Sequence, residues 1–211
     1  HRNTRRQRQM CIRDSSSNTL ISFEDRMSSK VLNGFFMNGS LDSLKLIGMA
    51  STTYHVFEDS LYKGKNLTSG DTIIMRFDEK DLDDIVVEGG SQGEYVPNKK
   101  TNDSDFPLIY SADRIDYFLK TETTKLIGNA KAKHENTDLK AGFIEVNWPT
   151  RILNAFPKKP HDSINQFIKP TIIEKGRDPM VGNEMTYNLD TKKGKINYGK
   201  TKADDGFYKG K

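Results

Sequence analysis

Apolar and polar residues alternate with a period of two over much of this chain. The alternation is clearest at 72–77, 85–87, 114–119, 143–148 and 185–189. A period of two puts every second side chain on the same face of a β-strand. The chain has no long window with apolar residues at the i, i+3, i+4 and i+7 spacing of an amphipathic helix. The pattern therefore predicts an all-β fold.

The strands together provide one continuous row of apolar side chains. The row comprises Ile73, Met75, Phe77, Ile85, Val87, Ile115, Tyr117, Leu119, Leu126, Ile144, Val146, Trp148, Met185, Tyr187 and Leu189. In a closed β-sandwich these side chains would fill the core. In an open roll they would line a groove able to hold acyl chains. Alternation alone does not distinguish the two arrangements.

Residues that tolerate positive φ separate the alternating runs. Glycine with lysine, asparagine or aspartate occurs at 63–66, 69–71, 193–195 and 205–206. Such residues are typical of tight turns. Strands at intervals of about 8–12 residues with turns between them indicate a sandwich, barrel or roll.

Two longer segments are expected to be loops, because proline cannot donate a hydrogen bond to a sheet. They are residues 97–107 and 157–170, and each carries proline at its ends. They divide the chain into blocks at 20–96, 108–156 and 171–211. None of these blocks is large enough for a core of its own, so we interpret them as rungs of one domain.

The chain also repeats itself. The sequence KLIGMA at 45–50 returns as KLIGNA at 125–130, and YFLKT at 117–121 returns as YNLDT at 187–191. Self-similarity of this kind is typical of stacked units that bury their apolar faces against neighbours. It predicts an elongated scaffold of stacked antiparallel strands.

The first fifteen residues differ from the rest. Residues 1–15 have no periodicity, and the segment at 10–15 resembles a translated sequencing adapter, so we expect a disordered, non-native leader. It carries five arginines and one aspartate, which equals the +4 formal charge of the whole chain. Residues 16–211 are therefore neutral, and the basic balance gives no reason to expect a nucleic-acid partner. Cys11 is the only cysteine, so thiol chemistry and disulfides are not expected in the domain.

No motif for catalysis, metal binding or cofactor binding emerges. The acidic run at 78–84 lacks the glycine and closing glutamate of an EF-hand and is interpreted as a hairpin tip. The GGSQG segment at 89–93 matches no phosphate-binding fingerprint and is interpreted as a bend at a strand end. His55, His134 and His161 lack metal-ligand spacing. We expect no cofactor and no enzymatic activity.

Three segments carry a resemblance to a known family. They are the KLIG segment with its second copy, the run from 67 to 90, and the strand–turn–strand segment at 181–196. In order and spacing, over residues 42–211, they resemble the OstA-like family of lipopolysaccharide transport. This family includes LptA and the N-terminal domain of LptD. The loops at 97–107 and 157–170 depart from its compact repeat.

The resemblance implies a twisted β-jellyroll, open along one side, with lipid A acyl chains in its apolar interior. It also implies a periplasmic, non-enzymatic transport module that stacks on other jellyroll proteins through exposed sheet edges. We expect the domain at 16–211 to be truncated at both ends, so that the full-length chain could continue into an outer-membrane barrel. The alternative is a structural or adhesive β-solenoid of a cell-surface protein, without lipid binding.

Overall fold

The structure is a computed structural model that describes residues 8–13, 20–58, 61–78, 81–98, 106–158, 167–203 and 206–209. Every regular element in this described part is a β-strand, which confirms the all-β prediction. In chain order the strands are β1 (Arg8–Arg13), β2 (Leu20–Ser28), β3 (Val31–Met37), β4 (Ser40–Glu58), β5 (Leu61–Asp78), β6 (Asp81–Pro97), β7 (Leu108–Phe118), β8 (Thr123–His134), β9 (Thr137–Asn147), β10 (Ile152–Phe156), β11 (Thr171–Glu174), β12 (Met180–Val181), β13 (Glu184–Asn188), β14 (Gly194–Asn197), β15 (Lys200–Ala203) and β16 (Gly206–Lys209).

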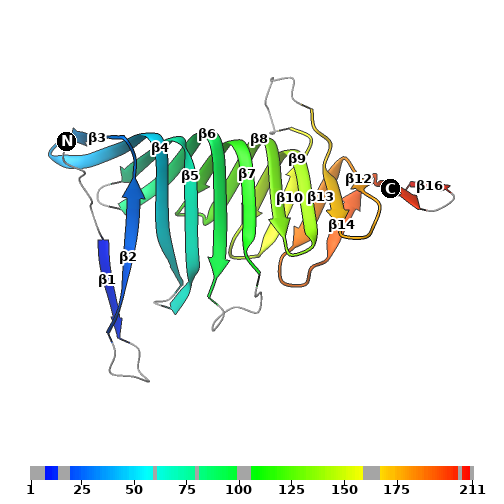
Figure 1. The fold of residues 1–211 in the computed structure, drawn as a ribbon, viewed down its shortest axis with the longest axis horizontal. Coiled ribbons are helices and arrows are strands. Elements are labelled where there is room, and N and C mark those ends of the chain that lie inside the picture. Colours follow the sequence, from blue (N-terminus) through cyan, green and yellow to red (C-terminus); the bar gives the residue numbers. More distant parts are fainter. Residues whose placement is uncertain are drawn as a thin grey trace.

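The strands form one antiparallel sheet that winds into an elongated roll (Figure 1). From β4 to β9 each strand pairs with its neighbour in sequence, so that these strands lie side by side along the long axis. The strands β2 and β3 both pair with β4 at one end of the roll. The short strands from β10 onward complete the other end.

Each long strand is bent in the middle and contributes to two limbs of the roll. The register of β4 to β8 shifts at the same level in every pair, as between Ile47 and Ala50 or between Ile127 and Ala130. We call the two halves limb A and limb B, and the level of the shifts the corner. Limb A contains residues 40–47, 72–78, 81–88, 114–118, 123–127, 143–147, 152–156 and 184–188, and limb B contains 50–58, 61–69, 91–97, 108–111, 130–134, 137–141 and 171–174.

Positive φ angles make the corner. They occur in pairs at Gly48-Met49 (77° and 52°), Gly89-Gly90 (77° and 61°) and Gly128-Asn129 (73° and 45°). A β-bulge with residues in the left-handed region bends its strand sharply. The first position of each pair is always glycine. At Gly89 a Cβ atom would overlap Asp71 of the neighbouring strand, so this position excludes a side chain by space as well as by conformation.

Two predicted turns are wrong, because the chain continues there as a single strand. Residues 63–66 and 69–71 lie inside β5, which continues from Leu61 to Asp78. The segment at 89–93 also lies within a strand, where it makes the corner bend of β6. Glycine, asparagine and aspartate are common in bulges as well as in turns. Because the bulges were interpreted as turns, strands of 17–19 residues were predicted as shorter strands.

The other predicted connections agree with the structure where it describes them. The loop at 97–107 separates β6 from β7, and the loop at 157–170 separates β10 from β11, although the central residues of both lie outside the described part. The acidic run at 78–84 lies at the end of the β5–β6 pair, where Asp78 pairs with Asp81 and residues 81–84 begin β6, while residues 79–80 lie outside the described part. Within the leader, residues 8–13 form β1, which pairs with β2, and residues 1–7 and 14–15 lie outside the described part.

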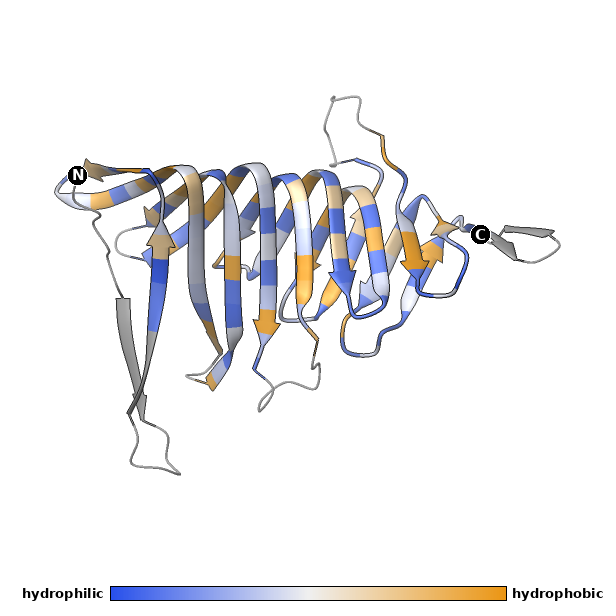
Figure 2. Ribbon diagram, in the orientation of Figure 1, coloured by the Kyte–Doolittle hydropathy of each residue, from blue (hydrophilic) through white to orange (hydrophobic). Residues whose placement is uncertain are grey.

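The apolar core lies between the two limbs. Figure 2 shows apolar and polar positions alternating along the strands, as expected when one face of each strand is buried. The inner faces of both limbs contribute, for example Leu46 and Ile73 from limb A with Leu108 and Leu139 from limb B. A small outer cluster also forms where Phe143 contacts Phe156 at 6.1 Å between ring centroids.

Candidate functional site

The predicted apolar row lies in the interior of the roll, and most of it is tightly packed. Ile73, Met75, Ile85, Val87, Ile115, Tyr117, Leu126, Ile144, Val146, Met185, Tyr187 and Leu189 are at most 6% exposed. Phe77, Leu119 and Trp148 are half-buried. Over most of the row the limbs pack against each other, as in the core-filling arrangement. Two cavities nevertheless lie along the row in the described part.

Hydroxyl groups brace the limbs across this interior. The Tyr110 hydroxyl of limb B donates to Asn66 Oδ1 at 2.7 Å and lies 3.2 Å from the Tyr117 hydroxyl of limb A. Tyr117 also lies 2.8 Å from Thr68 Oγ1 of limb B. Burial raises the pKa of both phenols, so they are neutral and can both donate and accept at ordinary pH. The network therefore joins limb A to limb B by hydrogen bonds between buried side chains.

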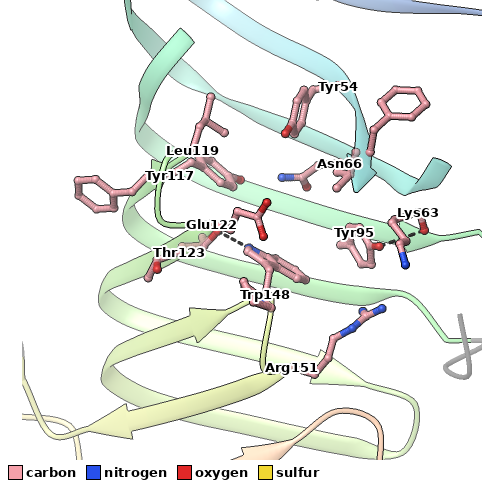
Figure 3. Close-up of a pocket in the computed structure, with 15 residues that line it drawn as sticks. Tyr54, Lys63, Asn66, Tyr95, Tyr117, Leu119, Glu122, Thr123, Trp148 and Arg151 are labelled. Atoms are coloured by element: carbon pink, nitrogen blue, oxygen red, sulfur yellow. Dashed lines mark hydrogen bonds between the residues drawn. The ribbon is translucent and has the colours of Figure 1, made fainter. Parts of the chain in front are cut away.

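The larger free space is a cavity of about 160 Å³ where the ends of the limbs face each other across the open side of the roll. We call this the mouth cavity (Figure 3). Limb B and the ends of its strands contribute Tyr54, Val56, Phe57, Lys63, Asn66 and Tyr95; limb A and its turns contribute Tyr117, Phe118, Leu119, Glu122, Thr123, Thr124, Trp148, Pro149 and Arg151. Three residues of the predicted row, Tyr117, Leu119 and Trp148, therefore line it.

Aromatic rings close one side of the mouth cavity. Trp148 of limb A lies 4.8 Å from Tyr95 of limb B and 6.5 Å from Tyr110, centroid to centroid. Its indole Nε1 donates to Thr124 Oγ1 at 2.8 Å, which fixes the ring orientation. The contact between Tyr95 and Trp148 therefore joins the two limbs at the mouth through side chains.

Two turns of limb A carry the charged groups of the cavity. The backbone amide of Trp148 donates to Glu122 O at 3.1 Å, which ties the turn after β7 to the turn after β9. The second turn presents Arg151, whose guanidinium lies 5.9 Å from the Tyr95 ring centroid. Its Nε is also 3.9 Å from Asp190 Oδ1. In Figure 3, Arg151 and Lys63 lie on the same side of the cavity as Tyr95, and Glu122 lies toward Thr123.

The second free space, about 140 Å³, opens between the limbs near the end of the roll formed by β11 to β14. It contains two further residues of the predicted row, Met185 and Tyr187, with Leu139 and Ile172 opposite. Leu126, Ile144 and Leu153 line neither space and belong to the packed core. His134 is buried beside this end, with Nδ1 3.5 Å from the Tyr187 hydroxyl.

Sequence reasoning missed several residues of the mouth cavity. Tyr95 lies on the same buried face of β6 as Gly93 and Pro97, so its inward direction could be predicted by continuing the period of two along the strand. Asn66 was assigned to a turn that the structure replaces with a strand. Arg151 belongs to a turn, where no period of two indicates which way a side chain points.

The site has no feature of a metal centre. Within the described residues, His, Cys, Asp and Glu form no group of three that could hold a metal ion. His55 instead contacts Asp25 Oδ1 at 3.0 Å, and His161 lies outside the described part. The ranges that the structure describes also contain no helix long and apolar enough for a membrane span.

Comparisons with known proteins identify the fold. No protein-family model matches the chain, and no curated protein matches it. Among solved structures, the chain is similar to LptH from Pseudomonas aeruginosa, described as the LptA homologous periplasmic component of the conserved lipopolysaccharide transport device. The similarity has a TM-score of 0.57 at 14% identity and covers 72% of this chain and 94% of that chain. The fold is thus an LptA-like β-jellyroll, as the sequence predicted.

Proposed function

We propose that this protein is a periplasmic, non-enzymatic module that binds the acyl chains of lipopolysaccharide between its limbs and passes the lipid towards the outer membrane. The observation that carries the proposal is the fold shared with LptH over most of both chains. The mouth cavity supports it, because its aromatic and aliphatic lining opens on the side of the roll where a lipid would enter.

The interior has the chemistry that such a role requires. Each acyl CH₂ removed from water contributes about 0.8 kcal/mol, so a lipid with several chains needs an apolar shelter to cross an aqueous compartment. The described contacts across the mouth are made by side chains, chiefly Tyr95 with Trp148 and Tyr110 with Tyr117. Parting these side chains would expose the apolar row without breaking a strand ladder.

Site-specific photo-cross-linking tests this function. A photoreactive residue in place of Leu119, which lines the mouth cavity, should cross-link to lipopolysaccharide. The same residue in place of Lys131, which is exposed on β8, should not. Equal cross-linking at both positions, or none at Leu119 in the folded protein, would contradict the proposal.

One observation favours a second function, a structural or adhesive module without lipid binding. The tight packing of the predicted row leaves little space for acyl chains in the present conformation. This alternative predicts no saturable lipid binding at any concentration below that at which the lipid aggregates. A saturable, cavity-specific cross-link would exclude it.

We also propose that the roll stacks on another jellyroll protein through the exposed edge of β3. Among the strands that the structure describes, β3 pairs with β4 alone, and all seven of its residues are exposed. Its apolar side chains include Val31, Phe35, Phe36 and Met37, with exposed fractions between 49% and 66%. An unpaired edge with apolar side chains can add a strand from a second sheet.

A further inference from the structure

The charged groups of the mouth cavity are unevenly distributed. Its lining contains two cations, Lys63 and Arg151, and one carboxylate, Glu122. Lys63 comes from limb B and Arg151 from limb A, yet both lie beside the Tyr95 ring (Figure 3). The opposite end of the cavity presents Tyr117 and Leu119 instead. One end of the same space therefore carries both cations, and the other carries the Tyr117 ring and Leu119 together with the Glu122 carboxylate.

Arg151 is held in this position by two weak contacts. The Tyr95 face attracts the guanidinium at 5.9 Å, and the Asp190 carboxylate is 3.9 Å from Nε, beyond direct hydrogen-bond distance. The Arg151 side chain is only 20% exposed, whereas that of Asp190 is 44% exposed. A half-buried guanidinium with a distant, solvated counter-ion keeps donors for an incoming anion.

We infer that the mouth cavity is a head-group site for an anionic amphiphile, in which Lys63 and Arg151 bind a phosphate and the side chains of Tyr117 and Leu119 contact the first part of its alkyl chain. This inference deepens the proposed function and depends on it for the natural ligand. Arginine and lysine from opposite limbs would hold the anion, so the bound phosphate would also bridge the mouth.

Glu122 gives the site a second, testable property. Its carboxylate lines the cavity on the side of Thr123, where it repels an anion and would attract a cation. If the ligand is anionic, removing this charge strengthens binding. If the aromatic rings with Glu122 instead form a site for a quaternary ammonium group, removing it weakens binding. The sign of the change therefore identifies the charge of the ligand.

The single tryptophan of the chain makes the site directly observable, because Trp148 lies in the cavity wall. We would follow its fluorescence in the full chain while adding dodecyl phosphate, dodecyl maltoside, dodecyltrimethylammonium or inorganic phosphate, each below its aggregation concentration. Dodecyl phosphate should bind most tightly. Inorganic phosphate alone should bind far more weakly, which separates a lipid head group from a free phosphate as the ligand.

Three variants test the named residues. Lys63→Gln and Arg151→Gln should each weaken dodecyl phosphate binding by about tenfold and leave dodecyl maltoside unchanged. Glu122→Gln should strengthen the binding of dodecyl phosphate. The control Lys131→Gln removes an exposed charge on β8 and should have no effect. Equal binding of all three dodecyl compounds in every variant would overturn the head-group site while leaving apolar binding intact. Tighter binding of the ammonium compound would overturn it in favour of a cation site.

Discussion

At the scale of single residues, hydroxyl and imidazole groups decide how firmly the limbs are closed. Tyr117 belongs to the predicted apolar row, but its hydroxyl contacts Thr68 and Tyr110 of the other limb. The ring of a tyrosine can thus pack in the core while its hydroxyl forms the hydrogen bonds that join the two limbs. In the second copy of the repeat, Tyr187 approaches His134 in a similar way, at 3.5 Å.

His134 makes the stability of the roll sensitive to acid. Its side chain is almost fully buried, and burial, followed by the Lys192 ammonium, lowers the pKa of the imidazole. Lys192 also pairs with Glu135 at 2.5 Å and lies over the Phe106 ring, which contacts His134 edge-on. The unfolded state, with the ordinary pKa near 6.5, therefore takes up a proton more readily than the folded state does.

We expect the contribution of His134 to the free energy of unfolding to be complete above pH 6.5. It should be lost as the pH falls from 6.5 towards the lower pKa of the folded state. Urea denaturation at pH 7.5 and pH 5 measures this loss. His134→Gln should reduce the difference between the two pH values. An unchanged difference in that variant would show that another group causes the acid sensitivity.

At the scale of elements, the corner explains the sequence repeat. KLIGMA and KLIGNA place their glycines, Gly48 and Gly128, at the same level of β4 and β8. Gly89 occupies that level in β6, where the buried Val87 precedes it and the buried Ser91 follows the bulge, although the surrounding letters differ. The repeated feature is therefore a bend with one glycine at its first position.

Glycine substitutions at the corner separate the cost of a strained backbone conformation from the cost of a steric overlap. Gly90→Ala, at φ 61° with nothing within 4 Å of a Cβ atom, should cost only the strain of the left-handed region, about 1 kcal/mol. Gly89→Ala would add an overlap with Asp71 and should cost about 2–4 kcal/mol in all. Urea denaturation of the two variants measures the difference. Equal losses would mean that Asp71 can move aside freely.

Strand positions and inner faces were predictable from sequence because both follow from a local period of two. The inward direction of Ile73, Ile115 and Ile144 is an example. The bends were not predictable from sequence. A bulge and a turn use the same residue types, and they differ in whether the chain stays paired with the same neighbouring strand. That pairing depends on residues far away in the sequence. The site was predictable only in part for a related reason: Trp148 follows the period of a strand, while Arg151 lies in a turn.

At the scale of the whole molecule, we expect the exposed edge at β3 to direct association with a second jellyroll. Phe36 is 66% exposed on this edge. A second copy of this chain is itself a jellyroll that β3 can meet. We therefore expect Phe36→Lys to reduce association between copies, because a charge at an edge strand disfavours pairing with another sheet. Light scattering after size-exclusion chromatography measures the mass.

A matched substitution elsewhere keeps that test specific. Ile109→Lys introduces the same charge at a 48% exposed position within β7, which is paired on both sides. It should leave the mass unchanged. If both variants reduced association equally, general surface hydrophobicity would be the cause, and β3 would have no special role.

Each long strand crosses from one limb through the corner into the other, so every strand adds one full cross-section of the roll. The number of strands therefore sets the length of the roll, and the length of each strand sets its width. The pair of strands β6 and β7 begins in limb A at Asp81, passes through limb B, and ends in limb A at Phe118, where the next strand follows. Duplicating residues 81–118 would extend the scaffold by two strands without altering its profile, so this architecture can gain reach by simple tandem insertion.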